Sequence, residues 1–109
     1  MNTPTLRERD LAWLRQTFQR FPWIGEARVF GSRATGTARR ASDIDLAISA
    51  PEATPHQWHD LVETLESAPI IYDLDVVRID QTLNPRLNEK VLREGLRIYP
   101  ETSGKAHVA

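Results

Sequence analysis

The 109-residue sequence contains no cysteine. This absence excludes disulfide bonds, thiolate zinc sites, iron–sulfur clusters and a cysteine nucleophile. The N-terminus lacks the basic start and the apolar run of a signal peptide. No apolar stretch approaches the roughly 18 residues that are needed to span a bilayer. We therefore expect a cytoplasmic protein that does not associate with membranes.

An excess of either charge is also missing, because 14 basic and 15 acidic side chains leave a formal net charge of −1. Proteins that bind duplex DNA usually carry surplus lysine and arginine to neutralise phosphates, so we expect no direct DNA binding. The composition, with 40% hydrophobic and 27% charged residues, is that of an ordinary globular domain. We predict one domain over residues 1–100 and a disordered tail over residues 101–109.

Apolar spacing predicts helices interleaved with short strands. Helices are expected from residue 5 to residue 21, with Thr5 and Glu8 as a capping box, from Thr54 to just before Pro69, and from Asn84 to Gly95. Strands are expected over residues 26–30, 43–49, 70–79 and 96–99, with a functional loop over residues 33–42. This order predicts an α/β (α+β) domain, in which helices cover one face of a small mixed sheet of three or four strands.

Two aspartates in the second strand are the first chemical signal. Asp43 and Asp45 are separated by one residue, so in a strand both point to the same face. Carboxylates this close repel each other unless protons or cations intervene, and hard oxygen ligands favour Mg²⁺ or Mn²⁺. Solvent-facing aspartates on an edge strand would give the same pattern.

The third strand repeats the signal with Asp73 and Asp75. Alternation places Leu74 and Val76 toward the helices and both acids on the opposite face. If this strand lies beside the one that carries Asp45, three or four acids share one open face, and a metal ion is the natural counter-charge. The alternative, that the acids only solubilise an uncovered face, stays open.

A glycine-containing loop lies between the first two strands. Gly31 follows its strand directly, which permits a sharp turn and a close approach to a ligand. The N–H groups after it and the Ser32 hydroxyl are able to cradle an anion such as a triphosphate, and Gly36 permits a second bend. Most Gly-Ser pairs are only turns, but a strand, such a turn and an acidic strand in this order outline a nucleotide site.

The combination of Gly31-Ser32, Gly36, Ser42-Asp43-Ile44-Asp45-Leu46 and Asp75 resembles the DNA polymerase β-like nucleotidyltransferase superfamily, and within it the minimal nucleotidyltransferase (MNT) branch. The resemblance covers about residues 6–100. It implies the polymerase β palm-like nucleotidyltransferase fold. It also implies transfer of a nucleoside monophosphate, usually AMP from ATP, with two Mg²⁺ ions, or Mn²⁺, at the site.

The resemblance also implies a role for each site residue. Asp43, Asp45 and Asp75 would be catalytic and would hold the metal ions, and Asp75 would take the proton of the acceptor hydroxyl. Asp73 competes with Asp75 for the third position. Nucleotide-binding roles fall to Gly31, Ser32, Arg33, Gly36 and Ser42: the first two would bind the β- and γ-phosphates, Arg33 would touch the triphosphate or be solvated, and Ser42 would bond the loop or cap the turn into the strand.

A partner is implied as well, since MNT proteins pair with HEPN-domain proteins that are often RNase toxins. Family members act as antitoxins by adding AMP to a tyrosine of the toxin (AMPylation). This fits a chain too short for an acceptor-binding domain, because a docked protein presents its own hydroxyl. Two alternatives stay open. In the first, the chain inhibits the toxin by covering its active site, without any transfer reaction. In the second, it transfers a nucleotide to a small molecule.

Overall fold

The computed structural model describes residues 4–37 and 43–101. Its elements are α1 (Glu8–Gln19), β1 (Glu26–Phe30), α2 (Ser32–Thr35), β2 (Ile44–Ser49), α3 (Pro55–Glu66), β3 (Leu74–Arg78), the 3-10 turn η1 (Ile79–Gln81), α4 (Pro85–Glu94) and β4 (Leu96–Tyr99). Ser42 and residues 102–109, most of the predicted tail, lie outside the described residues. In the part that is described, no helix is long and apolar enough to cross a membrane.

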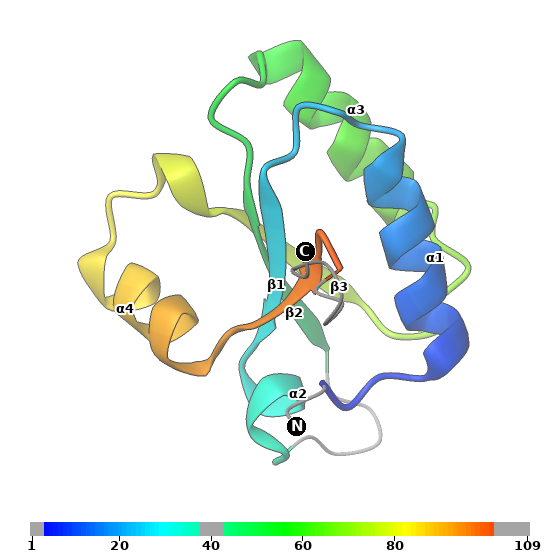
Figure 1. Cartoon of the computed structure of the whole chain (residues 1–109), viewed down its shortest axis with the longest axis vertical. Coiled ribbons are helices and arrows are strands. Elements are labelled where there is room, and N and C mark those ends of the chain that lie inside the picture. Colours follow the sequence, from blue (N-terminus) through cyan, green and yellow to red (C-terminus); the bar gives the residue numbers. More distant parts are fainter. Residues whose placement is uncertain (1–3, 38–42, 102–109) are drawn as a thin grey trace, which may run out of the picture.

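The four strands form one mixed sheet in the order β3-β2-β1-β4 (Figure 1). β1 pairs antiparallel with β2 and with β4, whereas β2 and β3 run parallel. The predicted α/β class and mixed sheet are therefore confirmed. The parallel pair needs a crossover connection, and α3 supplies it.

The main hydrophobic core lies between one face of the sheet and the helices α1 and α3. Leu14 and Phe18 of α1 and Leu61 of α3 are fully buried there. They pack with alternate residues of the strands, which are Ala27, Val29, Ile44, Leu46, Ile48 and Ile98. The strands therefore present their other alternate positions to the opposite face.

The sequence predicts that the opposite face is free of helices. In the structure, α4 covers part of it (Figure 1). Val91 of α4 packs with Phe30 and Ala47 in a second, smaller cluster, joined by Leu87 and Val77. The prediction of helices on a single face holds for α1 and α3 and is wrong for α4. The apolar side chains that β1, β2 and β3 present to this face supply the surface that α4 buries.

Two predicted boundaries are also wrong. The capping box of Thr5 and Glu8 does not form: α1 begins at Glu8 after Arg7, which makes no side-chain cap. The backbone of Thr5 is instead hydrogen-bonded to Arg33, by its N–H to the Arg33 carbonyl at 2.8 Å. β3 covers Leu74–Arg78 and not residues 70–79, because its pairing with β2 spans only the partners Ile44–Ile48.

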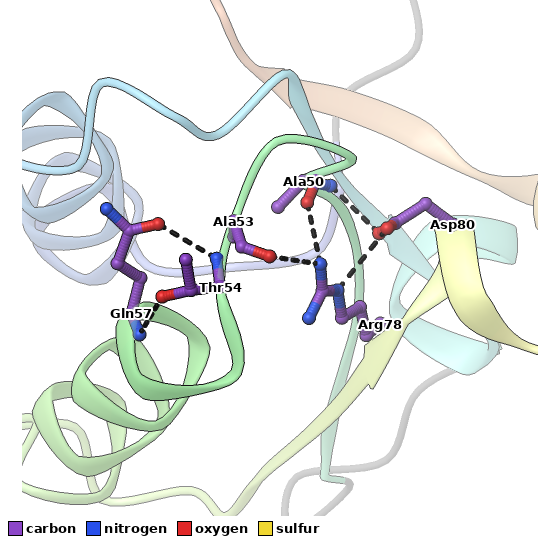
Figure 2. Close-up of polar contacts among 6 residues, drawn as sticks. All are labelled: Ala50, Ala53, Thr54, Gln57, Arg78 and Asp80. Carbon is purple, nitrogen blue, oxygen red and sulfur yellow. Dashed lines mark hydrogen bonds and ion pairs between the residues drawn. The ribbon is translucent and has the colours of Figure 1, made fainter.

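The predicted start of α3 is confirmed. The Thr54 side chain accepts a hydrogen bond from the backbone N–H of Gln57 at 3.1 Å, and the Gln57 side chain accepts one from the N–H of Thr54 at 2.9 Å (Figure 2). Pro55 occupies the first helical position, where no N–H is needed. These reciprocal bonds fix where the crossover helix begins.

Arg78, the last residue of β3, fastens the loop between β2 and α3. Its guanidinium donates to the carbonyls of Ala50 at 2.9 Å and Ala53 at 3.0 Å, and it pairs with Asp80 at 3.3 Å (Figure 2). Asp80 in turn accepts the N–H of Ala50 at 2.9 Å. The Arg78 guanidinium also lies over the Trp58 ring, 5.3 Å from its centroid. The network holds the end of β3 against the end of β2.

We expect Arg78→Met to lower the free energy of unfolding by about 2–3 kcal/mol, because charged hydrogen bonds to two otherwise buried loop carbonyls are lost. Methionine keeps much of the packing on Trp58. Urea denaturation measures the change. Arg93→Met is the matched control and should have a much smaller effect, because within residues 4–37 and 43–101 Arg93 forms ion pairs only with Glu89 and Glu94 of its own helix. Equal effects of the two substitutions would contradict this role for Arg78.

Candidate active site

The loop after β1 turns on Gly31, whose φ of +73° lies in the region that favours glycine. The Gly31 carbonyl accepts the N–H groups of Ala34 at 3.0 Å and Thr35 at 3.1 Å, which begins the single turn of α2. Gly36, with φ of +84°, ends that turn, and its N–H donates to the Ser32 carbonyl. The predicted bends at both glycines are therefore present, and Ser32 is held between them.

The parallel pairing of β2 and β3 places two predicted acids side by side. Asp45 is the register partner of Asp75, one position after the pair Ile44 and Leu74. Ile44 and Leu74 belong to the main core, so the two acids lie on the other face of the sheet. Asp75 is exposed and Asp45 is half-buried. The condition set by the sequence, that the two acidic strands be neighbours, is met.

The loop and the acids also meet. A Cβ on Gly31 would overlap the Oδ2 atom of Asp45, so any other residue at this position would require the carboxylate to move. No comparable contact exists at Gly36, where a Cβ would meet nothing within 4 Å. Gly31 thus permits both the turn and the approach, whereas Gly36 is needed only for its backbone conformation.

The electrostatics of Asp45 reflect this crowding. Burial raises the pKa of the Asp45 carboxyl, and the negative charges of Asp75 and Asp43 raise it further. The positive charge of Lys90, on α4, acts in the opposite direction on the same pKa. Asp43, Asp45 and Asp75 therefore form one electrostatic group, which we call the acidic group.

Asp73, the competitor for the third position, lies elsewhere. It precedes β3 and lines a cavity of about 410 Å³ between α3 and β3, together with Tyr72 and Leu65. Its backbone carbonyl accepts the N–H of Ile44 at 2.9 Å. Asp73 does not contribute to the charges that shift the pKa of Asp45. The geometry therefore favours Asp75 as the third acid.

Arg33 is neither solvated nor pointed freely at the loop, so the solvated alternative is wrong. Its side chain is buried, its guanidinium donates to the carbonyl of Thr5 at 2.8 Å, and it lies 4.3 Å from the centroid of the Tyr72 ring. These contacts tie α2 to the segment that precedes α1. Ser42, the remaining predicted nucleotide-binding residue, lies outside the described residues.

The donor chemistry of the acidic group fits a divalent cation. Carboxylates on adjacent strands supply hard oxygen ligands. Burial and, after it, the repulsion among the acids raise the pKa of Asp45, and a bound cation relieves that repulsion. Among residues 4–37 and 43–101, no three His, Cys, Asp or Glu side chains already converge closely enough to hold a metal ion. Closing the group around a cation therefore requires the exposed acids, Asp43 and Asp75, to adjust.

Two features of the site were missed from the sequence. Phe30 on β1 is the register partner of Asp45 and therefore borders the acidic group on the β1 side. Lys90 is the cation whose charge reaches Asp45. The spacing of Leu87 and Val91 predicts the buried stripe of this helix, and hence places Lys90 at its flank, but it does not say which face of the sheet the helix covers.

These elements, a glycine turn after one strand and acids on the next two, are the arrangement of a nucleotidyltransferase. The model of the family described as polymerase beta, nucleotidyltransferase matches residues 13–103. The chain belongs to this family. A comparison with curated protein sequences found no significant match.

Several solved structures similar to this chain are toxin–antitoxin complexes. One with AMP-PNP is 25% identical with a TM-score of 0.68, over 83% of this chain and 73% of that chain. A mutant of the MntA–HpeT toxin–antitoxin is 27% identical with a TM-score of 0.61, over 84% and 71%. A tri-AMPylated Shewanella oneidensis HEPN toxin with its MNT antitoxin is 20% identical with a TM-score of 0.63, over 86% and 72%. These neighbours match the MNT branch that the motifs indicated.

We expect Gly31→Ala to destabilise the fold more than Gly36→Ala. Both substitutions place alanine at a positive φ, which costs roughly 1–2 kcal/mol. Only the methyl group at position 31 would also collide with Asp45. Chemical denaturation of the two variants measures the difference. Equal losses of stability would contradict a costly contact between a side chain at position 31 and the Asp45 carboxylate.

We expect Asp45→Asn to raise the melting temperature near neutral pH in the absence of divalent ions. The raised pKa means that ionised Asp45 is less favourable in the folded protein than in the unfolded chain, so its ionisation opposes folding. The gain should shrink as the pH falls through the raised pKa and vanish below the ordinary value of about 3.9, where Asp45 is protonated in both states.

Calorimetry of wild type and Asp45→Asn across this pH range, with a chelator present, checks the sign. Asp73→Asn is the control, because Asp73 lies outside the acidic group. A lower melting temperature for Asp45→Asn at neutral pH would contradict the expected repulsion.

Proposed function

We propose that the chain is a magnesium-dependent nucleotidyltransferase that transfers AMP from ATP to a hydroxyl, that of a tyrosine, on a partner HEPN-domain toxin, and thereby acts as an antitoxin. The observation that carries the proposal is the register pair of Asp45 and Asp75 directly beside Gly31. Membership of the nucleotidyltransferase family and the likeness to toxin–antitoxin complexes support it.

In this proposal Asp43, Asp45 and Asp75 hold two Mg²⁺ ions, or Mn²⁺. Bound there, the ions supply positive charge that polarises the phosphate and favours an ionised acceptor oxygen. The N–H groups and hydroxyl of the Gly31-Ser32 turn hold the β- and γ-phosphates. The exposed position of Asp75 leaves it open to the acceptor, so that it takes the hydroxyl proton.

The reaction is a substitution at the α-phosphorus of ATP. The acceptor oxygen forms a bond to that phosphorus, the bond to the β-phosphate oxygen breaks, and pyrophosphate leaves. The proton of the acceptor hydroxyl goes to Asp75. Because Phe30 and α4 cover the neighbouring part of the sheet face, the acceptor has to approach over Asp43 and Asp75, the exposed members of the acidic group.

A protein acceptor is supported by what the structural neighbours are. One of them is a HEPN toxin that carries AMP groups in complex with an MNT antitoxin, and another is a toxin–antitoxin complex that contains AMP-PNP. A docked partner brings its hydroxyl in a fixed orientation, which supplies the proximity that transfer needs.

Labelling with ATP that carries the isotope at the α-phosphate tests the proposal. Wild type is incubated with Mg²⁺ and the product of the neighbouring gene, which the proposal requires to be a HEPN-domain protein, and we expect label on a tyrosine of that product. Asp45→Asn and Asp75→Asn should lower the rate at least about 100-fold, since metal binding or proton transfer is lost. Asp73→Asn should keep close to the wild-type rate.

Other outcomes overturn the proposal in distinct ways. A tight complex that silences the toxin without label indicates inhibition by covering its active site. If ATP is consumed when a small molecule with a hydroxyl group is present and the partner protein is absent, the acceptor is a small molecule. Equal losses in Asp73→Asn and Asp75→Asn would contradict the assignment of the third acid.

A further inference from the structure

Helix α4 crosses the face of the sheet that carries the acidic group. It is held there by Leu87 and Val91, which pack against Phe30, Ala47 and Val77. Phe30 and Asp45 are register partners, so the helix lies directly beside the acids. The side chains at the edge of its buried stripe therefore flank the active site.

The two flanks of α4 face opposite ends of this sheet face. Asn88 and Leu92, on one flank, line a cavity of about 370 Å³ with Glu26 and Ser49. Glu26 and Ser49 are register partners at the end of β1 and β2 that lies away from Phe30 and Asp45. The flank with Asn88 and Leu92 therefore points away from the acidic group.

Lys90 lies on the other flank. At about 100° per residue it is about 160° around the helix from both Asn88 and Leu92, and only about 60° from the half-buried Leu87. It therefore faces the end of the sheet where Phe30 and Asp45 pair. The effect of its charge on Asp45 agrees with this placement.

The fold itself makes little use of this cation. Lys90 is exposed, and no ion pair joins it to any residue within 4–37 and 43–101. Arg93, on the same helix, pairs with Glu89 at 3.8 Å and with Glu94 at 3.7 Å. Among the described residues, Arg33 is another cation near the loop, and its guanidinium is buried against Thr5 and Tyr72. Lys90 thus places an exposed ammonium on a long side chain at the rim of the acidic group.

We propose that the Lys90 ammonium binds the triphosphate of the nucleotide substrate, an inference that rests on the nucleotidyltransferase function proposed above. The ligand class follows from charge. The acidic group would repel an anionic nucleotide, and a compact ammonium on a flexible stem is suited to phosphate oxygens. In this arrangement the Gly31-Ser32 turn and Lys90 contact the triphosphate from β1 and from α4.

Calorimetric titration with Mg²⁺ and α,β-methylene-ATP, which cannot release pyrophosphate, tests the contact in the full chain. We expect Lys90→Gln to raise the dissociation constant about tenfold or more, the effect of one lost charged hydrogen bond. Lys90→Arg should recover most of the affinity. Arg93→Gln, the matched control on the same helix, should change it less than about twofold.

AMP separates a phosphate contact from a general electrostatic role. AMP lacks the β- and γ-phosphates, so the ratio of ATP-analogue affinity to AMP affinity should fall in Lys90→Gln. If Lys90 only balanced the acidic group, both affinities would change by the same factor and the ratio would stay constant. A constant ratio, or equal behaviour of Lys90→Gln and Arg93→Gln, overturns the proposal.

The same titration keeps the two proposals apart. Wild type that binds the ATP analogue but labels no partner contradicts the proposed transfer and still tests Lys90. Wild type that binds and transfers, with Lys90→Gln unaffected in both, overturns only the role of Lys90. Wild type that binds no nucleotide overturns both.

Discussion

The register between β2 and β3 is the constraint on which the site depends. Because side chains alternate along a strand, the burial of Ile44 and Leu46 forces Asp45 to the opposite face, and the burial of Leu74 does the same for Asp75. A slip by one residue would place the acids in the core and the apolar residues in water. The hydrophobic core under α1 and α3 therefore sets the spacing of the carboxylates. One face of β2 and β3 packs in the core, and the other face carries the acids.

Holding like charges together opposes folding, and the surroundings of the acidic group contain that effect in two ways. Asp75 and Asp43 remain exposed, so water screens them, and only Asp45 is partly withdrawn from solvent. α4 buries Phe30 and Ala47 beside the acids, which adds apolar contact where the sheet face would otherwise be wet. In the proposed function, the uncovered remainder of the face is where the nucleotide and its acceptor bind.

Features set by neighbouring residues were predictable from the sequence, whereas features set by contacts between distant parts of the chain were not. Strand β1 and the start of α3 at Thr54 match the prediction, since alternation, a glycine turn and a capping box are local signals. The start of α1 does not, because Arg33, far along the chain, binds the backbone of Thr5. The pairing of Asp45 with Asp75 was predictable only on condition that their strands are neighbours. The position of Lys90 depends on which face α4 covers, which its amphipathic pattern leaves undefined.

The reciprocal bonds between Thr5 and Arg33 join the segment ahead of α1 to the turn that carries Ser32. The Tyr72 ring lies against the same guanidinium, so the approach to β3 is part of this junction. A displacement of the segment ahead of α1 would therefore have to break these bonds or move the turn at Ser32 with it. Glu101 pairs instead with Arg15 of α1, at 3.5 Å. We therefore expect a fluorophore at position 101 to disturb the turn at Ser32 less than one at position 4, which lies next to Thr5.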